Sequence, residues 1–170
     1  PPPPTRDMFE WNHFQTQEME RCLSAKSFWY WKLPVIHGAF QTRRCALFNR
    51  ALTITLIARR SRHFAGTRYL KRGVSDDGHV ANDVEVEQVV CEEGAGEGRF
   101  ASLLQVRGSI PTYWMQETSV TMPKPPIIIK RRDPTYAATK RHFADLLERY
   151  GDGLMVLDLV KQREGSGRSS

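Results

Sequence analysis

Two runs of alternating apolar and polar residues constrain the fold of this chain most strongly. From Ala51 to Ala58, leucine and isoleucine alternate with threonine, and from Val84 to Val90, valine alternates with glutamate and glutamine. A period of two residues with many β-branched side chains is typical of strands that bury one face. With a further strand predicted over Ser102–Val106 and a turn at Ser75–Gly78, the pattern indicates an antiparallel hairpin or meander.

Helical signals lie toward the two ends of the chain. The best-defined helix is predicted between Asp133, which can cap the first turn, and Tyr150, which a glycine follows. The wholly apolar run Leu154–Val160 is predicted to be a buried strand. Near the start we expect a helix over residues 9–23 and, at residues 28–31, an aromatic core patch or strand, with a membrane-interface belt as the alternative. Together these elements predict an α/β fold, a mixed sheet with flanking helices.

The charge balance points to an anionic partner. The chain has 170 residues and a formal net charge of +6, from 25 lysines and arginines against 19 acidic residues. This excess favours nucleic acid, an acidic membrane face or a phosphorylated substrate. Basic residues are densest between Arg59 and Arg72, with Phe64 and Tyr69 interleaved. Phosphate binding by arginine forks, a single-stranded nucleic-acid clamp and a plain solvated surface all remain open from composition alone.

Composition also excludes some classes of protein. The chain has 40% hydrophobic residues, which argues against wholesale disorder. No run of about 18 apolar residues occurs, so we expect no ordinary transmembrane helix. Three cysteines cannot all pair with one another, and without a secretory leader we expect reduced thiols in the cytosol. Because the chain opens with four prolines and no methionine, we expect either a piece of a longer protein or an imperfect gene model.

The motifs of several enzyme classes are missing from this sequence. It has no glycine-rich loop followed by Lys-Ser/Thr, no Cys-x-x-Cys and no His-Glu-x-x-His, so no metal site is predicted. Cysteine phosphatases need a Cys, five residues and an Arg, because the thiolate attacks phosphorus while the arginine and loop N–H groups hold the oxygens. Six positions after the three cysteines stand Phe28, Ala51 and Glu97. We therefore expect structural or incidental roles for the cysteines, namely Cys22, Cys45 and Cys91.

Several long segments resemble the SAC-domain phosphoinositide phosphatases. They occur in the order and spacing of that family, at residues 59–73, 78–82, 84–88 and 106–111, followed by Trp114. Three more segments resemble the subgroup that acts on phosphatidylinositol 3,5-bisphosphate, at residues 9–12, 122–126 and 159–164. The similarity extends from about Phe9 to Glu164, which is nearly the whole chain.

The resemblance implies a reaction and a domain organisation. The family removes phosphate from inositol lipids through a cysteinyl-phosphate intermediate on a Cys-x5-Arg loop, which this chain lacks, so we expect the chain alone to be inactive. No cofactor is predicted from the chain itself, and Mg²⁺ enters only through the family resemblance. The family has a mainly β N-terminal subdomain before its α/β catalytic subdomain. We therefore expect four segments: a disordered leader (1–8), the end of the N-terminal subdomain (9–45), the first part of the catalytic subdomain (46–164) and a flexible tail (165–170).

The resemblance also supplies candidate site residues. Its Arg-Gly-Ser segment is expected beside the nucleophile loop, and its basic segment is expected to meet head-group phosphates or the acidic bilayer surface. A third segment is expected to support the site, most simply as a polar network across strands. The predicted phosphate and head-group contacts are Arg107, Ser109, Arg68, Lys71 and Arg72, and the predicted supporting residues are Asn82, Glu85 and Glu87.

The partners and location expected for this chain also follow from the family. The resemblance implies a phosphoinositide lipid, a peripheral membrane surface on endosomes or vacuoles in the cytoplasm, and a complex with a scaffold protein and a lipid kinase. The first alternative is a non-catalytic module that binds phosphoinositides or membranes or acts as a scaffold. The second is a nucleic-acid binder that uses the basic block Arg59–Arg72, which the resemblance disfavours.

Overall fold

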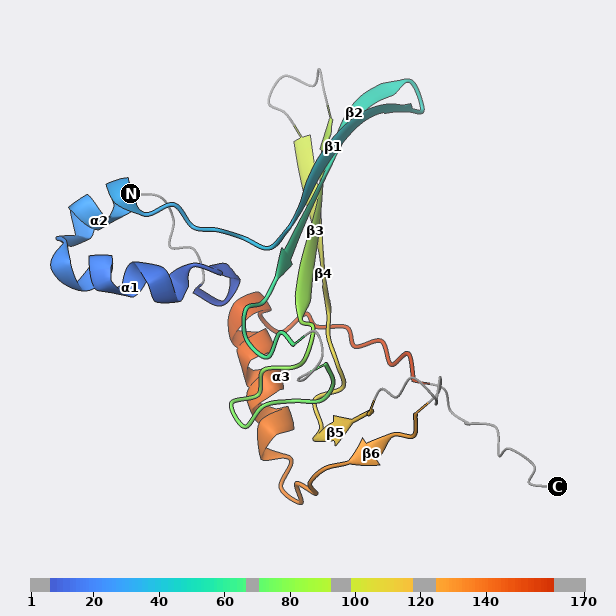
Figure 1. The fold of residues 1–170 in the computed structure, drawn as a ribbon. Coiled ribbons are helices and arrows are strands. Elements are labelled where there is room, and N and C mark those ends of the chain that lie inside the picture. Colours follow the sequence, from blue (N-terminus) through green and yellow to red (C-terminus); the bar gives the residue numbers. More distant parts are fainter. Residues whose placement is uncertain (1–6, 67–70, 93–98, 118–124, 161–170) are drawn as a thin grey trace.

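The computed structural model describes residues 7–66, 71–92, 99–117 and 125–160. Within these ranges the fold is mixed α/β, as expected (Figure 1). In chain order its elements are η1 (Asp7–Phe9), α1 (His13–Cys22), α2 (Ala25–Trp31), β1 (Gly38–Leu47), β2 (Arg50–Arg60), β3 (Val84–Glu92), β4 (Arg99–Arg107), β5 (Trp114–Met115), β6 (Ile128–Ile129) and α3 (Ala137–Tyr150). None of the described helices is long and apolar enough to cross a bilayer.

Strands β1 to β4 form one antiparallel sheet in sequence order, which confirms the predicted meander. The three strands predicted in this region are β2, β3 and β4. The sequence does not predict β1, because the adjacent Arg43 and Arg44 interrupt its alternation. β1 nevertheless pairs with β2 along its whole length, from Gly38 opposite Arg59 to Leu47 opposite Arg50. The subdomain boundary expected between residues 45 and 46 stays a prediction.

The pairing register sorts side chains onto two faces of the sheet. Residues opposite each other in antiparallel strands share a face, and neighbours along a strand alternate. Arg60, Val84 and Arg107 therefore lie on one face, and Arg59 and Glu85 lie on the other. We call the end of the sheet that carries these residues the base. The tip is the opposite end, which contains the β1–β2 turn; in Figure 1 it projects away from α3, β5 and β6, which gather at the base.

A small core closes the base of the sheet. Val74, Val80 and Ala138 are buried together, with Tyr113 packed against them. The predicted turn lies beside this core, where the Gly78 N–H donates to the carbonyl of Ser75 at 3.1 Å. Gly78 has a φ of 90°, a conformation in which glycine carries no steric cost. The core thus holds α3 and the loop between β2 and β3 against the same end of the sheet.

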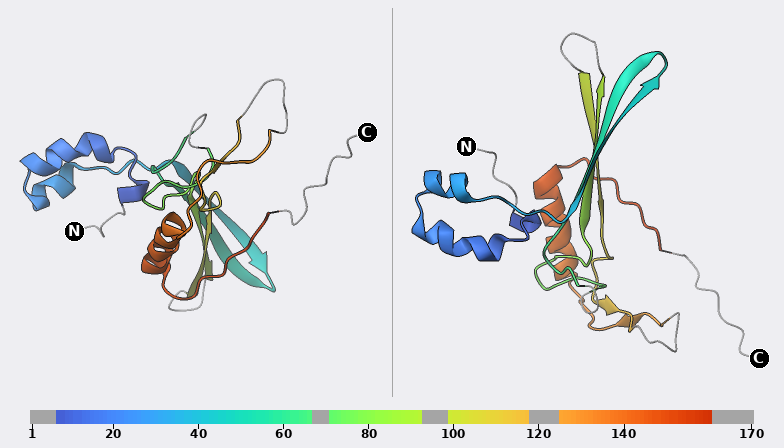
Figure 2. Two further views of the ribbon diagram at one scale, coloured as in Figure 1. Left: turned by 90° about the horizontal axis from the view of Figure 1, so that it is seen from below. Right: turned by 45° about the horizontal axis from the view of Figure 1, so that its top comes forward.

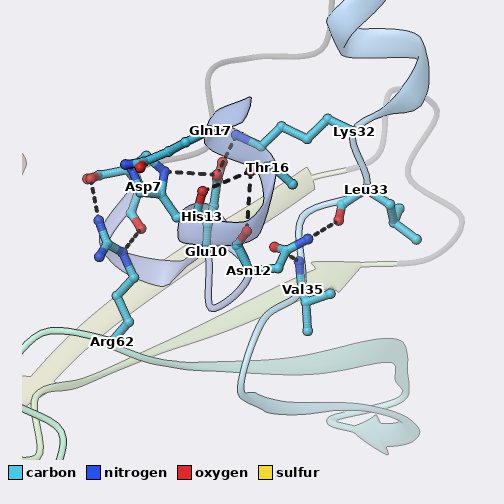
Figure 3. A network of polar contacts seen from close by, with 10 residues as sticks. All are labelled: Asp7, Glu10, Asn12, His13, Thr16, Gln17, Lys32, Leu33, Val35 and Arg62. Atoms are coloured by element: carbon cyan, nitrogen blue, oxygen red, sulfur yellow. Dashed lines mark hydrogen bonds and ion pairs between the residues drawn. The ribbon is translucent and has the colours of Figure 1, made fainter. Parts of the chain in front are cut away.

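The N-terminal helices are attached to the end of β2 by polar contacts. Arg62 makes two contacts with Asp7 (Figure 3). The Nη2 atom of Arg62 lies 2.8 Å from the Asp7 carboxylate, and the Nε–H group of Arg62 donates to the Asp7 backbone carbonyl. The Trp11 indole N–H donates to the carbonyl of Arg60 at 2.9 Å. In the views of Figures 1 and 2, α1 and α2 extend sideways from this attachment. Arg62 is therefore engaged by the start of the chain.

Two predictions of secondary structure are wrong. Residues 154–160 form no strand and pair with none of the described strands, and Leu159 is 91% exposed. Their apolar sequence signals burial, but a strand also needs a neighbour for its backbone groups. Residues 28–31 belong to the helix α2, whose first turn is capped by the Ser24 hydroxyl, with Phe28 buried and Trp31 exposed.

The two predicted helices are present but shorter than expected. The N-terminal one is divided into η1 and α1. The C-terminal one begins at Ala137, because Tyr136 adopts a left-handed φ of 52°. Asp133 still accepts a hydrogen bond from the Ala138 N–H at 3.2 Å. Asp7 and Met8 of the predicted leader belong to η1; the rest of that leader and the predicted tail lie outside the described residues.

Candidate functional site

A pocket of about 600 Å³ opens at the base of the sheet. Four basic side chains line it, and none of its described lining residues is acidic. The basic residues are Arg60, Lys71, Arg72 and Arg107. Clustered guanidinium and ammonium groups bind phosphate oxygens well, because each hydrogen bond is charge-assisted and arginine presents two parallel donors. The pocket is therefore suited to an anion with more than one negative charge.

The sheet register brings two of these arginines together. Arg60 ends β2 and Arg107 ends β4, and Val84 at the start of β3 lies opposite both of them. Adjacent strands are about 4.8 Å apart, so the two arginine backbones are separated by roughly 10 Å. Since all three residues share a face, the two guanidinium groups start from either side of Val84 and border the same pocket.

Asn82 connects two parts of the basic lining. Its φ of 56° is a left-handed conformation that asparagine adopts more readily than most residues. Its Oδ1 accepts a hydrogen bond from Arg60 Nη2 at 2.7 Å, and its Nδ2 donates to the carbonyl of Lys71 at 2.9 Å. One amide side chain provides both the acceptor and the donor. Asn82 therefore aligns the end of β2 with the segment that carries Lys71.

Ser109 ties the Arg-Gly-Ser segment to the loop between β2 and β3. Its Oγ accepts a hydrogen bond from the Gly73 N–H at 2.8 Å, and its own N–H donates to the carbonyl of Ala81 at 2.9 Å. A Cβ atom at Gly108 would lie only 2.6 Å from the Cγ2 atom of Val80, so the close approach requires glycine. Among the described residues none accepts a hydrogen bond from the Ser109 hydroxyl, so its hydrogen is available to a ligand.

The remaining basic residues of the pocket differ in how they are held. The Arg72 guanidinium lies 5.8 Å from the centroid of the Trp114 ring, and its Nε donates to the Gln116 side chain at 3.4 Å. In the described part of the chain, no hydrogen bond or ion pair engages the side-chain nitrogens of Lys71 or Arg107. These two cations are thus available for an incoming anion.

Two other arginines of the basic block form ion pairs with carboxylates of the chain. Arg59 Nη2 lies 2.6 Å from Glu85 Oε1 and 3.0 Å from Glu87 Oε2, on the sheet face away from Arg60. Glu85 is buried and also accepts a hydrogen bond from the Tyr150 hydroxyl. Arg62 pairs with the N-terminal segment, as described above. The continuous run of positive charge in the sequence is therefore divided between structural pairs and the pocket.

A buried acidic group lies where β3 meets α3. Burial raises the pKa of Asp83 to about 6; Arg149 opposes this shift, and the charges of Asp145 and Glu85 add to it. Arg149 Nη2 is 3.9 Å from the Asp83 carboxylate. Burial also raises the pKa of Tyr150, with a further contribution from its hydrogen bond to Glu85. These groups connect the helix to the sheet and are absent from the described lining of the pocket.

The structure brings most of the predicted site residues together. Four of the five predicted head-group contacts line the pocket, namely Lys71, Arg72, Arg107 and Ser109, and the fifth, Arg68, lies outside the described residues. Asn82 lines the pocket too, whereas Glu85 and Glu87 do not. Arg60 also lines the pocket and was not predicted to do so, although it continues the alternation that includes Leu56 and Ala58. Among the described residues, no group of three or more histidine, cysteine or acidic side chains is placed to hold a metal ion.

Comparison with known proteins assigns this chain to a family. The family model described as "SacI homology domain" matches residues 2–168. The chain belongs to this family. Its fold is thus that of a SAC-domain fragment, and the resemblance seen in the sequence to phosphoinositide phosphatases is confirmed at the level of the family.

Curated relatives of this SacI homology chain cover nearly all of it. "Phosphatidylinositol-3-phosphatase SAC1" of Arabidopsis thaliana is 49% identical over 164 residues, which are 95% of this chain and 18% of the relative. "Phosphoinositide phosphatase SAC5" of the same plant is 46% identical, over 96% of this chain and 21% of the relative. "Polyphosphoinositide phosphatase" of Schizosaccharomyces pombe is 43% identical, over 97% and 21%. The chain spans about a fifth of the length of these relatives.

Proposed function

We propose that this chain is the part of a phosphoinositide phosphatase that holds the phosphate groups of the lipid head group. The convergence of four basic side chains on one pocket without an acidic lining residue carries this proposal. Arg107 and Lys71 receive the phosphate oxygens, because no described residue engages them. Arg60 adds a further cation whose orientation is set by Asn82. Relatives named as phosphoinositide phosphatases support the same substrate class.

In the proposed reaction, this chain binds the head group, and another part of the protein breaks the bond between phosphate and inositol. Hydrolysis in the whole protein proceeds through a cysteinyl phosphate, formed when a thiolate attacks phosphorus and the inositol oxygen leaves. None of the three cysteines in this chain is followed, six positions later, by arginine. The nucleophile is therefore expected in a part of the protein beyond this sequence, and the 170-residue chain is expected to bind the head group without releasing phosphate.

The finer substrate and the location rest on the sequence resemblance. The segments at residues 9–12, 122–126 and 159–164 favour phosphatidylinositol 3,5-bisphosphate, and two ring phosphates match a pocket with four cations. We place the protein on the cytoplasmic face of endosomal or vacuolar membranes, in a complex with a scaffold protein and a lipid kinase. A nucleic-acid role is less favoured, because carboxylates engage Arg59 and Arg62 and so interrupt the basic track in the described part of the block.

Titration with soluble head groups tests the proposal. Calorimetry should detect binding of inositol 1,3,5-trisphosphate, which represents the 3,5-bisphosphate head group with its linking phosphate, and weaker binding of inositol 1-phosphate. Arg107→Gln should weaken the affinity at least about tenfold, since a hydrogen bond to a charged group contributes about 1.5–3 kcal/mol. Arg99→Gln is the matched control, because Arg99 starts the same strand at the opposite end. Equal affinity of wild type and Arg107→Gln would refute the pocket assignment.

A further inference from the structure

The turn between β1 and β2 has an unusual residue at its most exposed position. Phe48 and Asn49 have φ values of 49° and 60°, so both central residues of the two-residue turn are left-handed. This geometry is that of a type I′ turn, where asparagine, aspartate and glycine are preferred. The Phe48 side chain is 90% exposed, and the neighbouring Leu47 is 54% exposed. The tip therefore presents apolar side chains to solvent from a conformation that disfavours them.

The stability of this chain does not explain Phe48. A left-handed backbone costs an ordinary L-residue about 1–2 kcal/mol. At Asn82, which is also left-handed, the side chain makes two hydrogen bonds to Arg60 and Lys71. The exposed Phe48 ring makes no comparable packing contact in the described part of the chain. Outliers of this kind are found where function requires a particular side chain at a fixed place.

The charge of the hairpin indicates the nature of the partner. From Gly38 to Arg60 the chain has five arginines and no aspartate or glutamate. Near the tip, the register places Arg43 and Arg50 on the same face as Leu47. Arg50 lies 3.5 Å from Glu92 and is largely exposed, and Arg43 pairs with no described residue. In Figures 1 and 2 the turn bends away from the ends of β3 and β4.

We propose that the tip of the β1–β2 hairpin is a membrane contact that inserts Phe48 and Leu47 into the interface of an anionic bilayer. Arg43 and Arg50 then lie at the level of the lipid phosphates, where each basic residue contributes about 1 kcal/mol. A two-residue turn is too small for a specific protein interface, which buries about 800 Å² per partner. A bilayer requires no complementary surface, so a few apolar side chains with flanking arginines are sufficient. This contact is separate from the head-group pocket, which lies at the base.

Phe48→Asn is the decisive variant, because asparagine suits the left-handed turn and removes only the apolar side chain. The test is cosedimentation with vesicles of phosphatidylcholine and phosphatidylserine that contain no phosphoinositide. The wild-type chain should bind, and Phe48→Asn should lower the partition coefficient at least about tenfold, the effect of losing a buried aromatic side chain. Phe14→Asn is the matched control, because Phe14 is also a highly exposed phenylalanine (80%) but lies on α1, away from the tip. This variant should leave vesicle binding unchanged.

Charge variants complete the test of the tip. Arg43→Gln with Arg50→Gln should lower binding to the anionic vesicles about 25-fold, or roughly fivefold for each arginine, and should leave the weak binding to pure phosphatidylcholine unchanged. Phe48→Asn should leave the calorimetric affinity for soluble inositol 1,3,5-trisphosphate unchanged, because Phe48 does not line the pocket, so failure of the tip and failure of the pocket are distinguishable. Binding of Phe48→Asn equal to wild type would overturn the proposal. Two other outcomes would also overturn it: preferential binding of single-stranded RNA through Arg43 and Arg50, and a dimer that Phe48→Asn dissociates without any change in vesicle binding.

Discussion

Arginines occur at both the base and the tip of the four-stranded sheet, but the contacts that these arginines make differ. At the base, Arg59 meets Glu85 and Glu87, and Arg60 meets Asn82, within 3.0 Å in each case. At the tip, Arg50 and Glu92 are 3.5 Å apart, and the apolar turn is open to solvent. The same strands run through both ends, so the difference comes from what covers them. α3 and the β2–β3 loop pack on the base, whereas no described element packs on the tip.

This difference separates residues that maintain the fold from those free to bind. Where a buried carboxylate is in direct contact with an arginine, as Glu85 is with Arg59 at 2.6 Å, removing it takes a close partner from a charge in a poorly hydrated place. Where the pair is exposed, water replaces the lost partner at little cost. The base should therefore be sensitive to single substitutions, and the tip should tolerate them.

The largest expected effect comes from the buried carboxylate of the base. Glu85→Ala should lower the free energy of unfolding by about 3 kcal/mol, because Arg59 and the Tyr150 hydroxyl lose a partner they share. Glu92→Ala, the equivalent change at the tip, should cost less than about 0.5 kcal/mol. Urea unfolding followed by circular dichroism measures both. Similar losses for the two variants would contradict the proposed contrast between base and tip.

A second effect is a pH dependence that arises at the base. The pKa of Asp83 is about 6 in the folded chain against 3.8 for an ordinary aspartate, so the folded state binds the proton more tightly. Ionised Asp83 therefore lowers the free energy of unfolding above pH 6, and this cost disappears below about pH 4. Asp83→Asn should raise the free energy of unfolding by about 1–2 kcal/mol at pH 7.5.

The control for Asp83 is the exposed Asp152, where the same change should have no measurable effect. Melting curves recorded at several pH values between 4 and 8 test this prediction. Wild-type stability should fall through this range relative to Asp83→Asn. If the difference in stability between wild type and Asp83→Asn were constant from pH 4 to 8, the Asp83 carboxylate would not be the source of the pH dependence.

A third prediction concerns the close packing at Gly108. Gly108→Ala should cost about 1–2 kcal/mol, because the new methyl group would overlap the Val80 side chain. It should also weaken head-group binding, since the overlap displaces Arg107 and Ser109 from the pocket. Gly153→Ala serves as control, because a Cβ there has no atom within 4 Å. Thermal unfolding and calorimetry with inositol 1,3,5-trisphosphate measure the two effects.

The smallest expected effect lies at the tip and, like that of Asp83→Asn, is a gain in stability. Phe48→Asn should raise the free energy of unfolding by about 0.5–1 kcal/mol, because asparagine tolerates the left-handed turn better than phenylalanine. Urea unfolding detects this gain. Phe48→Ala, which keeps the strain and removes the ring, should not be stabilised. A loss of stability in Phe48→Asn would mean that the ring packs on the fold.

The sequence predicted the strands well where alternation was regular. β2 and β3 are partly buried and show a clear period of two, whereas β1 is exposed along its length and its arginines interrupt the pattern. The apolar run at residues 154–160 was misassigned, because hydrophobicity specifies burial and does not supply a pairing partner. The start of α3 was placed too early, because the left-handed backbone of Tyr136 delays the helix to Ala137, although Asp133 still accepts a hydrogen bond from the Ala138 N–H in the first turn.

The candidate site was predictable from motifs only in part. Family resemblance identified Arg107, Lys71 and Arg72, but no motif distinguishes Arg60 from Arg59. Their roles are opposite because successive residues of a strand face opposite sides, and only the structure shows which side carries the pocket. In the same way, Glu85 and Glu87 belong to one motif with Asn82 but lie on the face away from it.

Arg60, Val84 and Arg107 lie opposite one another on three neighbouring strands. The pocket therefore depends on the number of residues in these strands. One residue inserted or deleted within β3 or β4 would rotate everything beyond it by half a turn and carry Arg107 to the wrong side of the sheet. Changes of two residues would restore its direction. Splice forms, orthologues or grafted chimaeras whose strands differ by an odd number should therefore keep the architecture yet lose the cationic pocket.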